Sequence, residues 1–139
     1  MLDVNGDKVI MTNLEIIKST YEGASSEENG RNLEKYLSDK VKWKEADGFP
    51  LAGTYIGFEQ ISKHVFHRLA TEWTDYKFVV EDYVAEGNKV FAYGTYSGVF
   101  NNTGRSFNAR VAHLWTLENS KIIKFEQFVD SAPVNEAMQ

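Results

Sequence analysis

The sequence predicts an α+β domain in which three N-terminal helices pack against one strongly curved, mostly antiparallel β-sheet. Two observations carry this prediction. Helix-start signals and helical spacing of apolar residues are confined to the first half of the chain, whereas everything after Thr74 alternates as strands do, with turn signals between the strands. Helices followed by a run of strands are typical of α+β domains. The length of 139 residues suits one such domain with a sizeable core.

Start signals and apolar spacing predict the three helices. The motif TNLE at 12–15 is a capping box, in which the first and last side chains bond each other's backbone amides. The motif SSEE at 25–28 begins a second, shorter helix. Apolar residues at helical spacing predict a third helix from about Gly57 to Trp73.

Alternation of apolar and polar residues predicts the strands. The first is 41–46, and the glycine-rich segment 47–57 that follows it is expected to be a loop. Gly94 and Gly98 lie inside a long strand and predict bulges or sharp bends there. The remaining predicted strands cover residues 75–85, 89–100, 105–117 and 122–130.

Composition excludes several classes of protein. The chain has no cysteine, so disulfides and thiolate chemistry are ruled out. A net charge of −5 argues against a nucleic-acid partner, and no apolar stretch is long enough to span a membrane or to act as a signal peptide. We therefore expect a soluble cytoplasmic protein, with residues 1–11 as an N-terminal extension and residues 12–139 as a single domain.

The turn ENSK predicts which side chains share a face of the sheet. If Asn119 and Ser120 are the two central residues of a tight hairpin, His113 lies opposite Glu126, and Asp130 projects to the same side. This side also carries Phe107, Trp115 and Phe128, so it is expected to be the apolar, concave face. Phe125 and Gln127 are expected on the opposite side. A register shift of one residue would move the whole set to the other face, because the side-chain period of a strand is two.

Purely structural roles are the alternative for these polar residues. Glu126 could lie at the rim of the sheet, Asp130 could bond the chain where the strand ends, and His113 could be a satisfied core residue. His64 and His67 are spaced i, i+3 on the third helix, away from its apolar stripe and without a nearby acidic partner. No metal site and no cofactor are therefore predicted.

Three segments resemble a known family. They are WKEADGFPLAGTYIGFEQI at 43–61, SGVFNNTGRSFNARVAHLW at 97–115 and SKIIKFEQFVD at 120–130. Together, over about residues 12–133, the chain resembles the SnoaL-like group of the nuclear transport factor 2-like, or ketosteroid-isomerase-like, superfamily. The resemblance implies a cone-shaped sheet with a deep apolar pocket at one end, and homodimers formed through the outer face of the sheet.

The resemblance also implies site residues, with departures from each related enzyme. Tyr21 falls close to the substrate-polarising tyrosine of ketosteroid isomerases, but their late-strand acid falls near Ala112. Limonene-type epoxide hydrolases end the last strand with an acid, which Asp130 matches, although their arginine falls at about Ser97. SnoaL-type polyketide cyclases pair an aspartate base with a cavity histidine, and Asp130 with His113 is similar to that pair.

The predicted function is proton transfer on a hydrophobic carbonyl compound, by isomerisation, cyclisation, or dehydration or hydration. Asp130 is the first choice for the base and Glu45 the second, while His113 orients or shares the proton and Tyr21 donates to the substrate oxygen. The predicted substrate-binding residues are Trp43, Phe49, Phe58, Phe66, Tyr96, Trp115, Glu126 and Phe128.

Two non-catalytic functions remain open beside the enzymatic one, because this fold hosts all three. One is a module that holds a small molecule in the same pocket without converting it. The other is a protein-interaction domain, for which the cone would be filled or shallow.

Overall fold

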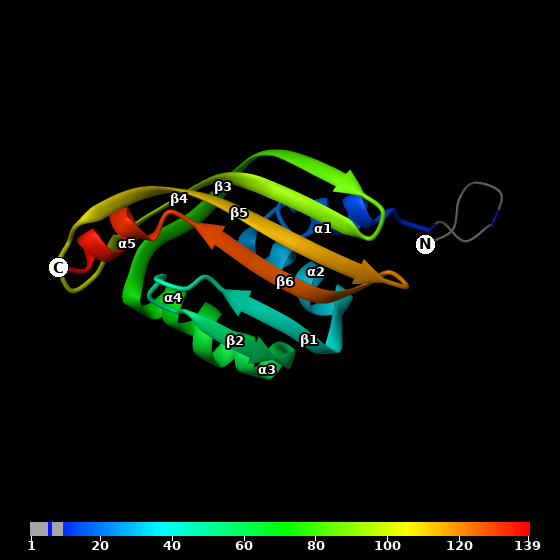
Figure 1. Ribbon diagram of the computed structural model, residues 1–139, viewed down its shortest axis with the longest axis horizontal. Coiled ribbons are helices and arrows are strands. Elements are labelled where there is room, and N and C mark those ends of the chain that lie inside the picture. Colours follow the sequence, from blue (N-terminus) through cyan, green and yellow to red (C-terminus); the bar gives the residue numbers. More distant parts are fainter. Residues whose placement is uncertain (1–5, 7–9) are drawn as a thin grey trace.

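The computed structural model describes residue 6 and residues 10–139. Figure 1 shows one curved sheet, with helix α5 (Ser131–Ala137) at the end far from the N-terminus. The predicted extension over residues 1–11 lies almost wholly outside the described residues, so its boundary stays a prediction. No helix in the described part of the chain is long and apolar enough to cross a membrane.

The first two helices begin where their capping signals predict. In α1 (Asn13–Ser19), the Thr12 hydroxyl accepts from the Glu15 amide at 3.1 Å, and the Glu15 carboxylate accepts from the Thr12 amide at 3.0 Å. In α2 (Ser26–Tyr36), the Ser25 hydroxyl accepts a hydrogen bond from the first turn. Such caps satisfy amides that have no partner inside the helix.

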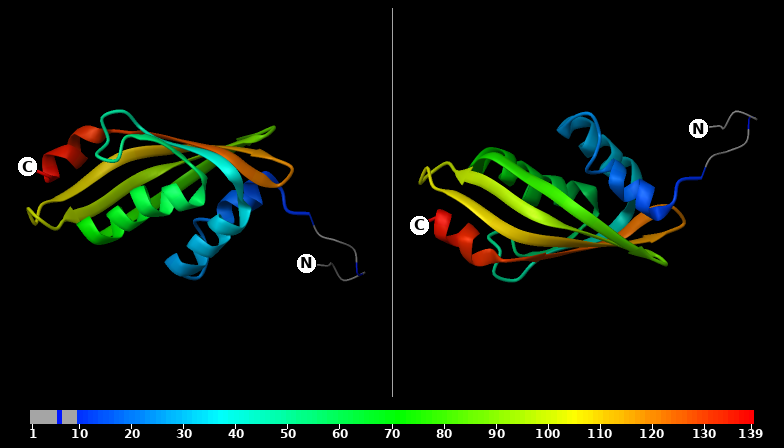
Figure 2. Two further views of the ribbon diagram at one scale, coloured as in Figure 1. Left: turned by 90° about the horizontal axis from the view of Figure 1, so that it is seen from below. Right: turned by 90° about the horizontal axis from the view of Figure 1, so that it is seen from above.

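The third predicted helix is one helical segment made of three parts. These are α3 (Gly57–Ile61), the π-helical turn η1 (Ser62–Phe66) and α4 (His67–Glu72). The span agrees with the prediction, but the wider π turn was not foreseen. Figure 2 shows this segment and the α1–α2 pair on the same side of the sheet. The π turn carries Val65 and Phe66 toward the interior of the protein.

The sheet has six strands in the order β2-β1-β6-β5-β4-β3. Only the β1–β6 pair is parallel; the other four pairs are antiparallel. The predicted α+β class with a mostly antiparallel sheet is therefore confirmed. The strands are β1 (Leu37–Glu45), β2 (Gly53–Ile56), β3 (Trp73–Glu86), β4 (Lys89–Phe100), β5 (Ser106–Glu118) and β6 (Lys121–Val129).

Two short elements were not predicted. Strand β2 lies within the segment expected to be a loop, and it is a four-residue edge strand with mostly exposed side chains, so it has no alternation signal. Helix α5 follows β6 directly and buries Val134 and Ala137. A helix of seven residues depends on tertiary packing rather than on local propensity, and sequence spacing cannot reveal that packing.

The two strand glycines mark bends, as predicted. The register of β3 against β4 shifts between Val80 and Asp82, opposite Gly94, and again opposite Gly98. A Cβ atom on Gly94 would lie only 1.9 Å from the backbone oxygen of Val79. The close approach of the bent β3 therefore requires glycine at this position.

The hairpin between β5 and β6 has the predicted turn but not the predicted register. Asn119 and Ser120 are its central residues, with φ of 51° and 62°, as a type I′ turn requires. The register then slips by one residue, because Ile123 is an extra residue in β6. His113 consequently lies opposite Gln127, so its predicted pairing with Glu126 is wrong.

This slip reverses the faces of β6 beyond Ile123. Phe125 and Gln127 are buried on the concave face, whereas Phe128 is exposed on the outer face. On β4 and β5 the predicted faces are confirmed, since Tyr96 pairs with Ala109, and both are buried together with His113.

Candidate functional site

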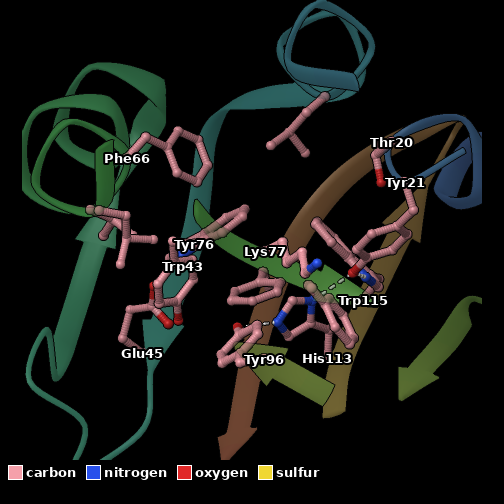
Figure 3. A pocket seen from close by; sticks show the side chains of 15 residues that line it. Thr20, Tyr21, Trp43, Glu45, Phe66, Tyr76, Lys77, Tyr96, His113 and Trp115 are labelled. Carbon is pink, nitrogen blue, oxygen red and sulfur yellow. Dashed lines mark hydrogen bonds between the residues drawn. The ribbon is translucent and has the colours of Figure 1, made fainter. Parts of the chain in front are cut away.

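A cavity of about 200 Å³ lies between the helices and the concave face of the sheet. We call it the aromatic cavity, because most of its walls are aromatic rings (Figure 3). Residues from seven helices and strands and from the end of α1 meet here. The side chains used below are Tyr21, Trp43, Glu45, Phe66, Tyr76, Tyr96, His113 and Trp115.

Trp43 is held rigidly in the wall. Its ring stacks on Phe125 of the adjacent strand, with centroids 3.8 Å apart and an angle of 20° between the planes. Edge contacts with Phe66 and Trp115, each at 5.6 Å, fix it from two other sides. Aromatic pairs of this kind favour one orientation, so the position of the indole N–H is determined by packing.

His113 lies in the middle of a chain of hydrogen bonds. Its Nδ1 is 2.6 Å from the Tyr21 hydroxyl, and its Nε2 is 2.5 Å from the Tyr96 hydroxyl. The Trp115 indole donates to the Tyr21 hydroxyl at 2.8 Å, and the Gln127 amide donates to the Tyr96 hydroxyl at 3.0 Å. We call these five side chains the His113 chain.

The orientation of the Gln127 amide is set by a backbone contact. The amide of Ala46 donates to Gln127 Oε1 at 3.0 Å, which leaves the Gln127 nitrogen to face Tyr96. Ala46 follows Glu45 directly, so this bond also ties the end of β1 to the His113 chain. Sequence reasoning placed Gln127 on the outer face, and only the slip at Ile123 brings it inside.

Burial keeps His113 neutral. The ring lies in the core without a carboxylate among its hydrogen-bond partners in the described structure, and desolvation lowers its pKa to about 3. At neutral pH one ring nitrogen is therefore a donor and the other an acceptor. A neutral imidazole between two hydroxyl groups can pass a proton from one to the other.

Glu45 is the acidic group of the aromatic cavity. Its side chain is almost fully buried, with 3% exposed, and desolvation raises its pKa to about 8. The nearby Trp43 indole opposes this rise without reaching hydrogen-bond geometry. Glu45 is therefore largely protonated at neutral pH and is a stronger base than an ordinary glutamate once it ionises.

Three buried polar atoms in the described part of the chain lack a hydrogen-bond partner. They are Glu45 Oε2, the indole nitrogen of Trp43 and the Tyr76 hydroxyl, and all three residues line the aromatic cavity. Burial raises the pKa of Tyr76, so its hydroxyl stays protonated and can donate. Buried polar groups almost always have partners, and three exceptions around one cavity indicate where the polar end of a ligand would bind.

Most of the predicted site residues line the aromatic cavity. They are Tyr21, Trp43, Glu45, Phe66, Tyr96, His113 and Trp115. Phe49 is buried behind Tyr96, with ring centroids 6.3 Å apart, and Phe58 is a half-buried residue packed against the core. Neither of these two lines the cavity wall.

The other three predicted residues lie outside the aromatic cavity, so their predicted placement on its face is wrong. Glu126 is on the outer face, 4.0 Å from Lys44 Nζ, and Phe128 is 46% exposed. Asp130 is exposed at the end of β6, beside a shallow groove lined in part by Phe128 and Arg110. The extra residue Ile123 causes all three displacements, because a slip of one residue exchanges the faces of a strand.

Sequence reasoning also missed eight wall residues, among them Tyr76, Phe78 and Phe125, and the network residue Gln127. Tyr76 and Phe78 enter from β3, whose two register shifts against β4 decide which of its residues face the cavity. Phe125 and Gln127 were placed on the wrong face. No group of three or more His, Cys, Asp or Glu side chains within residues 10–139 is arranged to hold a metal ion.

Comparison with solved structures identifies relatives of this fold. An NTF2-like protein from Burkholderia thailandensis is 38% identical, with a TM-score of 0.88, and the match covers 94% of this chain and 99% of that one. TerC, crystallised with polyporic acid, is 21% identical, with a TM-score of 0.77 and coverage of 91% and 97%. A candidate SnoaL-like polyketide cyclase from Mesorhizobium loti is 24% identical, with a TM-score of 0.69 and coverage of 85% and 99%.

The sequence comparison gives the same family. No curated protein matches the chain. The profile of the SnoaL-like domain matches residues 17–125, which include every cavity residue named above. The chain therefore belongs to the SnoaL-like family and has the NTF2-like fold.

Proposed function

We propose that this protein is a small-molecule enzyme that binds a cyclic carbonyl compound in the aromatic cavity and transfers a proton on it. The observation that carries the proposal is the carboxyl group of Glu45, which is buried, unpartnered at one oxygen and surrounded by aromatic rings. A carboxyl group in such surroundings has a pKa near the pH at which the enzyme works, which suits general acid–base catalysis.

The chemistry follows from the groups around Glu45. Its carboxylate form removes a proton from the carbon next to the carbonyl group, and negative charge develops on the carbonyl oxygen. The hydroxyl groups of Tyr76 and Tyr96 and the indole N–H of Trp43 can donate to that oxygen. Return of the proton to a different carbon completes an isomerisation. In a dehydration, a hydroxyl group on the β-carbon takes the proton back from Glu45 and leaves as water while the C=C bond forms.

The volume of the aromatic cavity limits the size of the substrate. A cavity of about 150 Å³ in another protein holds one benzene molecule. At about 200 Å³, the aromatic cavity holds a substituted single ring or two small fused rings. A buried steroid or tetracyclic polyketide would be too large, so we assign a monocyclic or bicyclic carbonyl compound.

Relatives of the same fold support binding of a small molecule. TerC was crystallised with polyporic acid, and a ketosteroid-isomerase-like protein from Catenulispora acidiphila was crystallised with trimethylamine. These proteins share 21% and 17% identity with this chain, so their ligands support a small-molecule site and not a particular substrate.

Hydrogen–deuterium exchange on simple ketones tests the proposal, whatever the natural substrate is. 2-Indanone and 2-tetralone in D₂O lose the protons next to the carbonyl group, and NMR measures the rate. We expect the protein to accelerate this exchange and Glu45→Gln to lower the acceleration about 100-fold, the usual size of a general-base effect. Asp130→Asn is the matched control, and it also tests the sequence-based assignment of Asp130 as the base.

Two results would contradict the proposal. If Glu45→Gln accelerates ketone exchange as much as the unchanged protein does, Glu45 is not the base. If both ketones raise the melting temperature of the protein but neither exchanges, the cavity is a binding site without catalysis. The protonated state of Glu45 at neutral pH favours this second function, because an uncharged carboxyl group beside buried donors can simply hold a carbonyl compound.

We also propose that two copies associate through the outer face of the sheet. Three large apolar side chains are exposed there, at Val79, Val84 and Phe128, with exposed fractions of 56%, 60% and 46%. They lie on β3 and β6, and their strand partners also face outward. Val79 and Val84 lie on one strand, and a large exposed apolar patch is typical of a surface that a partner covers.

A further inference from the structure

The His113 chain contains one hydrogen more than its contacts can use. Its four contacts are Trp115–Tyr21, Tyr21–His113, His113–Tyr96 and Tyr96–Gln127. With a neutral imidazole, the available hydrogens are the indole N–H, two phenolic O–H groups, one ring N–H and one amide N–H. Five donors and four contacts leave one donor free.

The free donor must be a phenolic O–H. The Trp115 indole can only donate, and the contact with Ala46 turns the Gln127 nitrogen toward Tyr96. The residues at both ends of the chain therefore donate to the tyrosine hydroxyl groups. The position of the single ring proton on His113 then decides which tyrosine keeps a free hydroxyl hydrogen.

The two neutral forms of His113 give opposite results. When the proton is on Nε2, it is donated to Tyr96, while Tyr21 donates to Nδ1, and the Tyr96 O–H is free. When the proton is on Nδ1, it is donated to Tyr21, while Tyr96 donates to Nε2, and the Tyr21 O–H is free. Both tyrosines line the aromatic cavity, so in either form the free donor belongs to a residue of the cavity wall.

We propose that His113 is a neutral proton relay between Tyr21 and Tyr96, and that it supplies the proton that the ligand oxygen takes up. This inference rests on the proposed function. It assigns the acid of the reaction to Tyr96, which is buried, and the resupply of protons to Tyr21, whose residue is half-buried although burial raises the pKa of its hydroxyl. His113 acts through the two tyrosines and is a positioning residue.

Formation of an enol through the relay conserves every proton. Glu45 takes the proton from carbon, the C–H electron pair forms the C=C bond, and the carbonyl oxygen takes the free proton of Tyr96. The proton on Nε2 then moves to the Tyr96 oxygen, and the Tyr21 proton moves to Nδ1. The Tyr21 oxygen finally takes a proton from the solvent, which leaves Glu45 protonated and both tyrosines neutral.

Nitrogen NMR of the histidine ring tests the relay in the absence of substrate. A protonated and a bare ring nitrogen differ strongly in ¹⁵N chemical shift, and the chain has only three histidines. The exposed His64 and His67 serve as internal references. In the unchanged protein we expect both nitrogens of His113 to have intermediate shifts, because the two neutral forms exchange.

Removal of either hydroxyl group should lock the ring in one form. In Tyr21→Phe, Nδ1 loses its partner, and we expect the proton to remain on Nε2, since an orphaned buried N–H is rarer than an unused acceptor. In Tyr96→Phe, we expect the proton on Nδ1. The matched control is Tyr93→Phe on the outer face, which should leave both shifts unchanged.

Several outcomes overturn the relay. They are a proton on the same nitrogen in both variants, a doubly protonated ring at pH 7, and a single fully protonated nitrogen in the unchanged protein. The last measurement needs no variant, so it decides the question even if a variant does not fold.

The exchange assay separates this inference from the proposed function. If both hold, Tyr21→Phe slows the exchange of 2-indanone about tenfold. The double variant, Tyr21→Phe with Tyr96→Phe, should be no slower than Tyr96→Phe alone, because a relay acts as one unit. Additive losses overturn the relay while leaving proton transfer by Glu45 intact. If the nitrogen shifts show that His113 interconverts between its two neutral forms, but no ketone exchanges its hydrogens, the relay holds and the proposed function is wrong.

Discussion

At the scale of single residues, two titratable groups share one cavity and are both kept neutral by burial. Desolvation raises the pKa of Glu45 to about 8 and lowers that of His113 to about 3. Neither side chain is paired with an opposite charge in the described structure. At neutral pH these two buried groups are therefore uncharged, and the cationic residue of the described lining is the exposed Lys77. The buried part of the cavity suits a neutral carbonyl compound better than an ion.

The raised pKa of Glu45 predicts that stability falls as the pH rises. The native state keeps the proton up to a pH of about 8, whereas the unfolded chain releases it near the ordinary value of 4.5. The stabilisation is complete below the unfolded pKa and is lost as the pH rises through the folded pKa. The low pKa of His113 has the opposite effect below about pH 6.5, the ordinary histidine value, because only the unfolded chain binds that proton there. The loss from Glu45 is therefore seen between about pH 6.5 and about pH 8, where it is on the order of 2 kcal/mol.

Urea unfolding at several pH values checks this prediction. The free energy of unfolding should fall over this pH range in the unchanged protein and stay nearly flat in Glu45→Gln, which cannot ionise. Glu126→Gln on the outer face is the matched control and should follow the unchanged protein. Parallel curves for Glu45→Gln and the unchanged protein would show that Glu45 is not held protonated.

At the scale of elements, bends and register slips decide which residues meet. The bends of β3 bring Tyr76 and Phe78 to the concave face, and the extra residue Ile123 turns Gln127 inward. The alternating pattern predicts which residues share a face on either side of a slip, but it does not show where the slip occurs. The face of every later residue depends on that position.

The glycine opposite the bend of β3 gives a prediction at this scale. In Gly94→Ala the new methyl group would lie 1.9 Å from the Val79 backbone oxygen, so β3 must move away. We expect a loss of about 3 kcal/mol in the free energy of unfolding, as for severe overpacking. Gly98→Ala is the matched comparison, since its nearest contact is 3.3 Å, and it should lose less. Equal losses would contradict this account of the bend.

At the scale of the whole molecule, the sheet has two different faces. The concave face is covered by helices and encloses the aromatic cavity, whereas the outer face exposes Phe128 and Val84. The proposed dimer would cover the outer face and leave the cavity of each copy complete. Association and chemistry are therefore expected to respond to different substitutions.

Sedimentation measurements test this separation. Phe128→Asp places a charge on the proposed contact surface, and we expect it to shift the protein from dimer to monomer. Ketone exchange should remain within about twofold of the unchanged protein, since Phe128 does not line the cavity. Ser26→Asp, on an exposed position of α2 on the other side of the sheet, is the control. A monomer before substitution, or a dimer after it, would contradict the proposed interface.

The family resemblance supplied Tyr21, whereas local sequence patterns were enough to establish the α+β class, the capped helices and the strand faces of β4 and β5, which carry Tyr96 and His113. These features follow from local spacing and from turns that close over a few residues. Tertiary structure was needed to show that Gln127, and not Glu126 or Asp130, faces His113. The physical reason is that one inserted residue costs little free energy locally but moves every later residue of the strand to the opposite face.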